Sequence, residues 1–109
     1  MKLADKTCVA CTGGMAKLTS DEWRLLLPQL NGWHVEGKML TQTFKYPDFV
    51  QSLAMANKIG QLAEAEGHHP DLHIAWGMLK VDIWTHKVDG LTESDFVLAA
   101  KIDRLRKGA

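Results

Sequence analysis

One stretch decides how this chain folds: residues 64–95, which read EAEGHHPDLHIAWGMLKVDIWTHKVDGLTESD. Gly67 is a natural stop for a helix that precedes it. Residues 72–76 and 79–84 alternate apolar with polar or small side chains, the period of a β-strand. Gly77 lies where these two strands would turn, so they are expected to pair as an antiparallel hairpin.

Three helices are expected in the sequence around this stretch. Leu18–Trp23 contains a capping box and a hydrophobic staple, which predict a helix from about Ser20 to Leu30. A middle helix begins with Pro47 in its first turn and ends at Gly67. Its helical spacing is carried by Phe49, Leu53, Ala56, Gly60 and Ala63. Leu91–Phe96 repeats the capping box with Asp95 in place of Glu, which predicts a last helix to about Arg106.

Two further strands complete the fold. Trp33–Glu36 and Met39–Tyr46 are separated by Gly37-Lys38, a short hairpin signal. The order is therefore helix, two strands, helix, two strands, helix. This order predicts an α+β fold, with a four-stranded antiparallel sheet and three helices packed on one face. Residues 1–17 are expected to form an N-terminal arm and residues 18–109 the domain.

Composition narrows the possible functions. The 109 residues carry a formal net charge of zero, which gives no support to nucleic-acid binding. No apolar run approaches the roughly 20 residues that span a bilayer, and the first residues do not resemble a signal peptide. We therefore expect a cytoplasmic protein without membrane contact, whose Cys8 and Cys11 are reduced. Cys8-x-x-Cys11 lacks the further ligands of a zinc site and the context of a redox motif, so we assign it to neither.

Histidines gather in the deciding stretch. His68 and His69 follow the predicted helix end, His73 lies in the next strand, and His86 ends the last strand. Glu64 lies in the last turn of the middle helix. Ends of neighbouring strands and helices can meet in space, and histidine has an unperturbed pKa of about 6.5 that suits proton transfer near neutrality. His68, His69 and His86 are therefore candidate catalytic residues, whereas His73 is expected on the surface.

The pattern Glu64, His68-His69-Pro70, Trp76, His86, Asp95 resembles the signature of the pterin-4a-carbinolamine dehydratases, and the similarity extends from about Leu18 to Arg106. The resemblance implies the same fold, a dimer or tetramer, and a 4a-hydroxytetrahydropterin substrate. The implied products are the quinonoid dihydropterin and water, formed without a metal or an organic cofactor. It also implies a site made of catalytic His68, His69 and His86 with Glu64, Pro70, Trp33 and Asp95 at the substrate.

Simpler roles compete for some of these residues. Glu64 could be only a solvated helix end, and Asp95 is also the third residue of a capping box. Trp33 and Trp76 could each be a core or edge aromatic, although an aromatic face would suit a flat pterin. For the acid–base chemistry, His68 and His86 are the expected proton carriers and His69 the residue that orients the substrate.

Two other functions remain open from the sequence. Some relatives of this family act as dimerisation partners of transcription factors, so a binding module without catalysis is the alternative. A metal protein using His69 and His73 is a third possibility, but Pro70 between them argues against the helix that would put both on one face. Finally, the open edges of a four-stranded sheet favour assembly into a homodimer or homotetramer.

Overall fold

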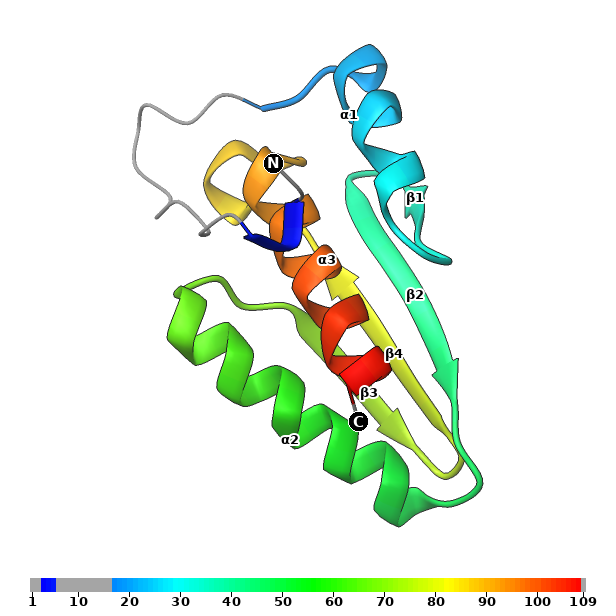
Figure 1. The fold of residues 1–109 in the computed structure, drawn as a ribbon. Coiled ribbons are helices and arrows are strands. Elements are labelled where there is room, and N and C mark those ends of the chain that lie inside the picture. Colours follow the sequence, from blue (N-terminus) through cyan, green and yellow to red (C-terminus); the bar gives the residue numbers. More distant parts are fainter. Residues whose placement is uncertain (1–2, 6–16, 109) are drawn as a thin grey trace.

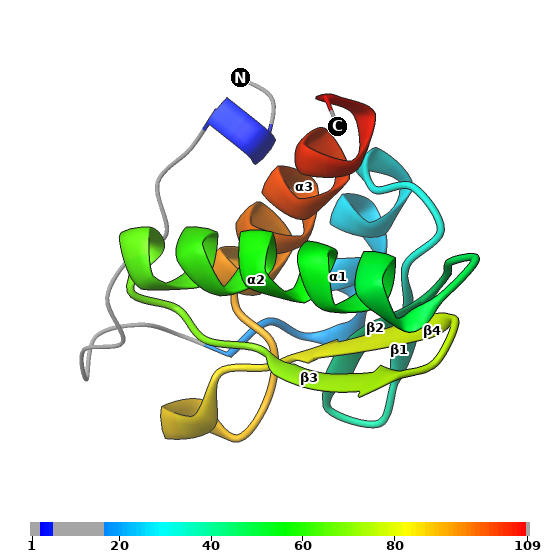
Figure 2. The ribbon, with the colours of Figure 1, turned by 90° about the horizontal axis from the view of Figure 1, so that it is seen from below.

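Four antiparallel strands form one sheet, and the three helices lie on one of its faces (Figures 1 and 2). The computed structural model describes residues 3–5 and 17–108. The strands are β1 (His34–Glu36), β2 (Met39–Lys45), β3 (Asp71–Ala75) and β4 (Met78–Ile83), in the spatial order β1-β2-β4-β3. Every neighbouring pair is antiparallel. The predicted α+β architecture is confirmed.

The first helix, α1 (Ser20–Leu26), begins where the capping box predicts and ends earlier than expected. Thr19 Oγ1 accepts a hydrogen bond from the Glu22 amide at 3.3 Å, and the Glu22 carboxylate accepts one from the Thr19 amide at 2.8 Å. The expected continuation to Leu30 is wrong, because a 3₁₀ turn, η2 (Leu27–Gln29), replaces it. Pro28 has no amide hydrogen to donate and its ring would collide with the preceding turn, which ends the α-helix.

The middle helix, α2 (Phe49–Glu66), begins after the expected Pro47 because Asp48 caps it. The Asp48 carboxylate accepts a hydrogen bond from the Gln51 amide at 2.9 Å. Its buried face is shifted from the predicted one, and consists of Ser52, Met55, Ala56, Ile59 and Ala63. Phe49 and Leu53 instead lie 44% and 40% exposed. This helix ends at Gly67, as predicted.

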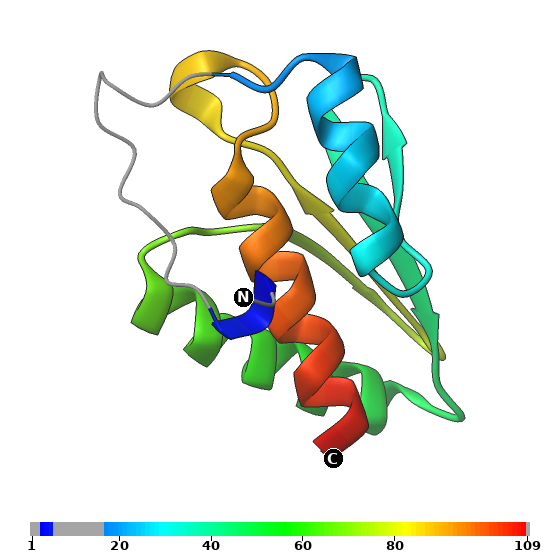
Figure 3. The same cartoon turned by 45° about the horizontal axis from the view of Figure 1, so that its top comes forward.

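The last helix, α3 (Glu93–Gly108), is the centre of the fold. The sheet and α2 lie on one side of it, and the 3₁₀ turn η1 (Leu3–Asp5) lies on its outward side (Figure 3). Leu3 is buried there, and Asp5 accepts a hydrogen bond from Arg104 at 2.6 Å. Cys8 and Cys11 lie outside the described residues, and the boundary at residue 17 stays a prediction.

The main core lies between the sheet and α3. Its largest fully buried side chains come from β2, α2, β4 and α3: Leu40, Phe44, Ile59, Leu79, Val81, Ile83, Phe96, Val97, Leu98 and Ile102.

Within residues 3–5 and 17–108, no helix has both the length and the apolar character needed to cross a membrane. The segment between α2 and β3 and the segment between β4 and α3 both leave this core at the same end of α3, which places the candidate site.

Candidate active site

The connection from α2 into β3 turns one histidine inward and one outward. Gly67 adopts a left-handed conformation, with φ of 67°, and its amide donates to the Ala63 carbonyl. This region is costly for residues with a Cβ atom, which explains a glycine at this turn. His68 is then 5% exposed, whereas the side chain of His69 is 61% exposed.

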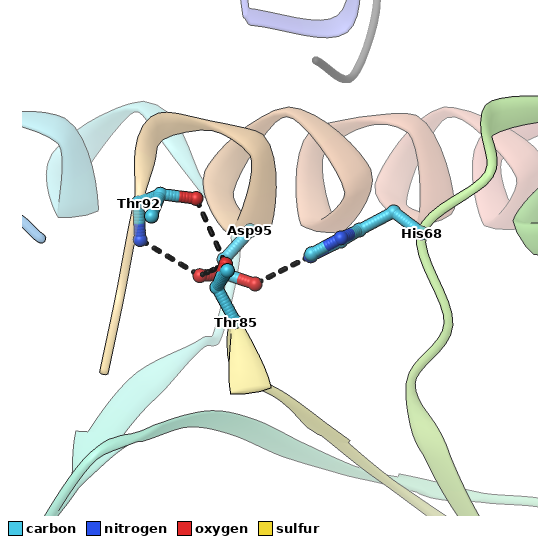
Figure 4. Close-up of polar contacts among 4 residues, drawn as sticks. All are labelled: His68, Thr85, Thr92 and Asp95. Carbon is cyan, nitrogen blue, oxygen red and sulfur yellow. Dashed lines mark hydrogen bonds and ion pairs between the residues drawn. The ribbon is translucent and has the colours of Figure 1, made fainter. Parts of the chain in front are cut away.

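His68 is anchored to the first turn of α3 by a buried network (Figure 4). Its Nε2 lies 2.6 Å from Asp95 Oδ1, and Asp95 is fully buried. The other oxygen, Oδ2, accepts hydrogen bonds from Thr85 Oγ1 at 2.9 Å and from the Thr92 amide at 2.8 Å. The two threonine hydroxyls lie 2.9 Å apart. A carboxylate can only accept, so Nε2 carries the proton of this bond, and Nδ1 is the ring nitrogen that this bond leaves unoccupied.

Asp95 therefore has two structural functions at once. It completes half of the predicted capping box through the Thr92 amide, and it holds His68. Both oxygens are occupied by groups of the protein, so the carboxylate contacts His68 and does not face open space. The place of Asp95 at the substrate stays a prediction.

His69 makes the second histidine–carboxylate pair, at the surface. Its Nε2 lies 2.5 Å from Glu64 Oε2, and Glu64 lies in the last turn of α2. The Glu64 side chain is 78% exposed, so solvent screens this pair. The structure thus brings Glu64 to the histidines as expected, and its contact there is His69.

His86 does not end a strand as the sequence predicts. Strand β4 ends at Ile83, and His86 begins a short 3₁₀ turn, η3 (His86–Val88). The chain turns there because Thr85 and Gly90 pair through two backbone hydrogen bonds of 2.8 and 3.3 Å. The His86 ring stacks on Trp84, with ring centroids 4.2 Å apart and an angle of 21° between the planes.

The three histidines line one open pocket of about 220 Å³, together with Gly67, Trp84 and Lys87. A larger cavity of about 520 Å³ lies between the first half of α2 and the end of α3. No histidine lines that larger cavity, whose titratable groups are Tyr46, Lys58, Asp103, Arg106 and Lys107. Histidine is the side chain best suited to proton transfer near neutral pH, so the smaller pocket is the candidate active site.

Two expected site residues do not line this pocket. Pro70 is half-buried in the connection before β3. Trp33 is buried in the core, packs edge-on against Phe44, and donates from Nε1 to Asp103 at 2.8 Å. Asp103 lies eight residues beyond Asp95 in α3, which is about 12 Å along the helix axis. Trp33 thus has a place in the core, and its contact with substrate stays a prediction.

The remaining histidine of the deciding stretch lies on the open face of the sheet, as expected. His73 is 59% exposed there, with Nε2 3.2 Å from Asp82 Oδ2. Within the described part of the chain, no group of three or more His, Cys, Asp or Glu side chains is arranged to hold a metal ion.

Sequence reasoning missed Trp84, Thr85 and Thr92. Trp84 lines the pocket, and the Thr85 hydroxyl and the Thr92 amide hold the carboxylate of Asp95. Their only signal is position: Trp84 and Thr85 directly precede His86, and Thr92 was identified only as a helix cap.

Comparison with known proteins bears directly on this arrangement. The profile of the family described as pterin 4 alpha carbinolamine dehydratase matches residues 16–105, which include every residue of the pocket. The chain belongs to this dehydratase family. A relative from Rickettsia bellii, named for the same dehydratase activity, is 56% identical over 106 residues, with 95% of this chain and 94% of the relative covered. One from Rubrobacter xylanophilus is 47% identical, with 95% and 98% covered.

Two solved structures share the fold. A transcriptional coactivator/pterin dehydratase from Brucella melitensis superimposes with a TM-score of 0.77 at 32% identity, covering 83% of this chain and 98% of its own. A pterin dehydratase-like protein described as a RuBisCO assembly factor has a TM-score of 0.59 at 23% identity, with 69% and 89% covered, and shows likeness of fold alone.

Proposed function

We propose that this chain dehydrates a 4a-hydroxytetrahydropterin to the quinonoid dihydropterin and water by histidine acid–base catalysis. The observation that carries the proposal is the single pocket lined by His68, His69 and His86 in a member of this dehydratase family. This pocket favours catalysis over the alternative of a binding module without activity.

The reaction needs only proton transfers. The bond between C4a and the hydroxyl oxygen breaks, the proton on N5 is removed, and a double bond forms between C4a and N5. The hydroxyl leaves as water after it receives a proton. The reaction needs no oxidant or reductant, so a general acid and a general base account for all of it.

We assign the two proton transfers to His68 and His86. His68 suits this role because its Nε2 is held by Asp95, which leaves Nδ1 as the exchanging atom. The buried carboxylate also compensates the positive charge that His68 acquires when it takes a proton. His68 and His86 line the same small pocket, so either histidine can serve as acid or base within a catalytic cycle.

His69 and Glu64 are assigned to substrate orientation. Their pair lies at the exposed rim of the pocket, where it can donate to polar atoms at the edge of a pterin ring. Asp95 is a positioning residue for His68. The chemistry gives Trp33 and Pro70 no part in proton transfer.

The test is turnover of chemically prepared 4a-hydroxytetrahydropterin, followed by ultraviolet absorbance against the uncatalysed rate. The proposal expects acceleration that persists after exhaustive chelation of metal ions. An unchanged rate of dehydration in the presence of folded protein would contradict it. Activity that chelation abolishes and zinc restores would contradict the histidine mechanism while leaving the substrate class standing.

A further inference from the structure

We infer that Trp84 is a positioning residue that sets the orientation of the His86 imidazole for proton transfer. This inference rests on the proposed function. It follows from a difference among the three pocket histidines, since carboxylates hold two of them and an aromatic ring holds the third.

Carboxylates hold two of the three histidines. Asp95 holds His68 at 2.6 Å and Glu64 holds His69 at 2.5 Å. His86 is exposed, and the contact that the described residues give its ring is the stack on Trp84 at 4.2 Å. A carboxylate occupies one nitrogen of the imidazole that it orients, whereas a stacked indole covers the flat face and leaves both nitrogens in the ring edge unoccupied.

Trp84 is itself held in place from two sides. It directly follows β4, is half-buried and packs against the core. The Lys38 ammonium, from the hairpin between β1 and β2, lies 5.8 Å from the Trp84 ring centroid. Lys38 also donates to Asp89 at 2.5 Å, and Asp89 caps the turn η3 that carries His86. The hairpin therefore supports both the indole and the end of the histidine's turn.

The stack restricts an imidazole that would otherwise rotate on an exposed turn. Aromatic pairs gain about 0.5–1.5 kcal/mol beyond the apolar area they bury, which is enough to favour one orientation by about twofold to tenfold. A catalytic group held in its reactive orientation raises kcat, whereas substrate affinity depends less on it. Trp84 thus contributes to proton transfer indirectly, because it orients His86.

Three variants test the inference. Trp84→Leu should lower kcat about five- to tenfold with KM changed less than about threefold. Trp84→Phe keeps an aromatic face and should retain kcat within about threefold. Trp23→Leu is the matched control, because Trp23 in α1 is likewise half-buried against the core but does not line the pocket, so this variant should leave both constants unchanged. Circular dichroism and thermal unfolding identify any variant that fails to fold.

A second readout does not depend on turnover. In the wild type, the indole ring current should move the His86 ring-proton NMR signals upfield, with assignment by comparison with His86→Ala. The shift should disappear in Trp84→Leu, persist in part in Trp84→Phe and be unchanged in Trp23→Leu. An absent shift in the wild type overturns the inference, as does full kcat in a folded Trp84→Leu. A wild type without dehydratase activity sinks the proposed function, while the NMR signals still decide whether Trp84 orients His86.

Discussion

Asp95 is the residue on which the largest number of site contacts depend. It accepts from His68, from Thr85 and from the Thr92 amide, and it is fully buried. Asp95→Ala would leave these donors without an acceptor inside the protein. Breaking a buried pair in this way typically costs about 3–5 kcal/mol, so the free energy of unfolding should fall by about that amount. Urea denaturation measures it, with Asp21→Ala on the exposed first turn of α1 as control.

Asp95→Asn separates charge from shape. The amide oxygen can still accept from Thr85 and Thr92, but the amide nitrogen then faces His68 Nε2 as a donor. His68 must therefore move its proton from Nε2 to Nδ1 to keep the bond. We expect a folded variant with kcat at least about tenfold lower, because the exchanging nitrogen holds the wrong proton state. Nitrogen chemical shifts of His68 report the tautomer, and an unchanged tautomer with wild-type kcat would contradict the assigned role.

At this scale the sequence predicts residue types better than it predicts contacts. His68, His69, His86, Glu64 and Asp95 were all identified, and the structure brings all five to one end of α3. The direct contact of Asp95 with His68 could not be predicted, because it depends on how α2 docks against α3. Trp33 and Trp84 are the clearest contrast. Both are tryptophans near strand ends, and only the packing decides that one faces the core and the other the pocket.

Gly67 and Gly60 form a matched pair within one element, at the end and in the middle of α2. A Cβ atom at either position would meet no heavy atom within 4 Å, so backbone conformation alone distinguishes them. Gly67→Ala forces alanine into the left-handed region and should destabilise the protein by about 1–2 kcal/mol. Gly60→Ala should stabilise it by about 0.5–1 kcal/mol. Equal changes of the same sign in thermal unfolding would contradict this account of the helix end.

A hydrogen bond between charged side chains links the turn η3 to the β1–β2 hairpin. The hydrogen bond from Lys38 holds the pKa of the Asp89 carboxyl below its ordinary value of 3.8. Because the folded-state pKa is the lower one, this contribution to stability is present above 3.8 and is lost as pH falls through the lowered value. Lys38→Gln should raise the pKa of Asp89 toward 3.8, as measured by NMR titration, and high salt should weaken the effect. Lys45→Gln is the control. An unchanged pKa of Asp89 in Lys38→Gln would contradict the proposed effect of the Lys38–Asp89 hydrogen bond.

Element boundaries follow local chemistry where a cap is present. The capping box of α1 and the glycine after α2 are where the sequence predicts them, since both depend on neighbouring residues alone. His86 was placed at a strand end, although the strand stops at Ile83. Thr85 pairs with Gly90, and this pairing turns the chain there. No short-range sequence pattern predicts which residues pair in this way.

For the whole molecule, assembly into a dimer or tetramer stays a prediction. The small residues of α2 would let a second helix approach closely, but Ala56 and Ala63 are buried against the chain's own core. The outward face of α2 instead exposes Phe49, Val50 and Leu53. Such contiguous apolar side chains favour burial against another subunit. Light scattering should give a multiple of the 12.2 kDa chain mass, and Leu53→Glu should lower it. A 12.2 kDa species across a dilution series would exclude assembly.

The central claim is that the pocket histidines carry the protons, and kcat of the single and double variants tests it most directly. His68→Ala and His86→Ala should each lower kcat at least about tenfold in folded protein. The double variant should lose less than the product of the two single losses, because either imidazole can partly replace the other. His34→Ala, whose exposed ring pairs with Glu36 on β1, should keep the wild-type rate. Wild-type kcat in folded His68→Ala and His86→Ala would contradict the account.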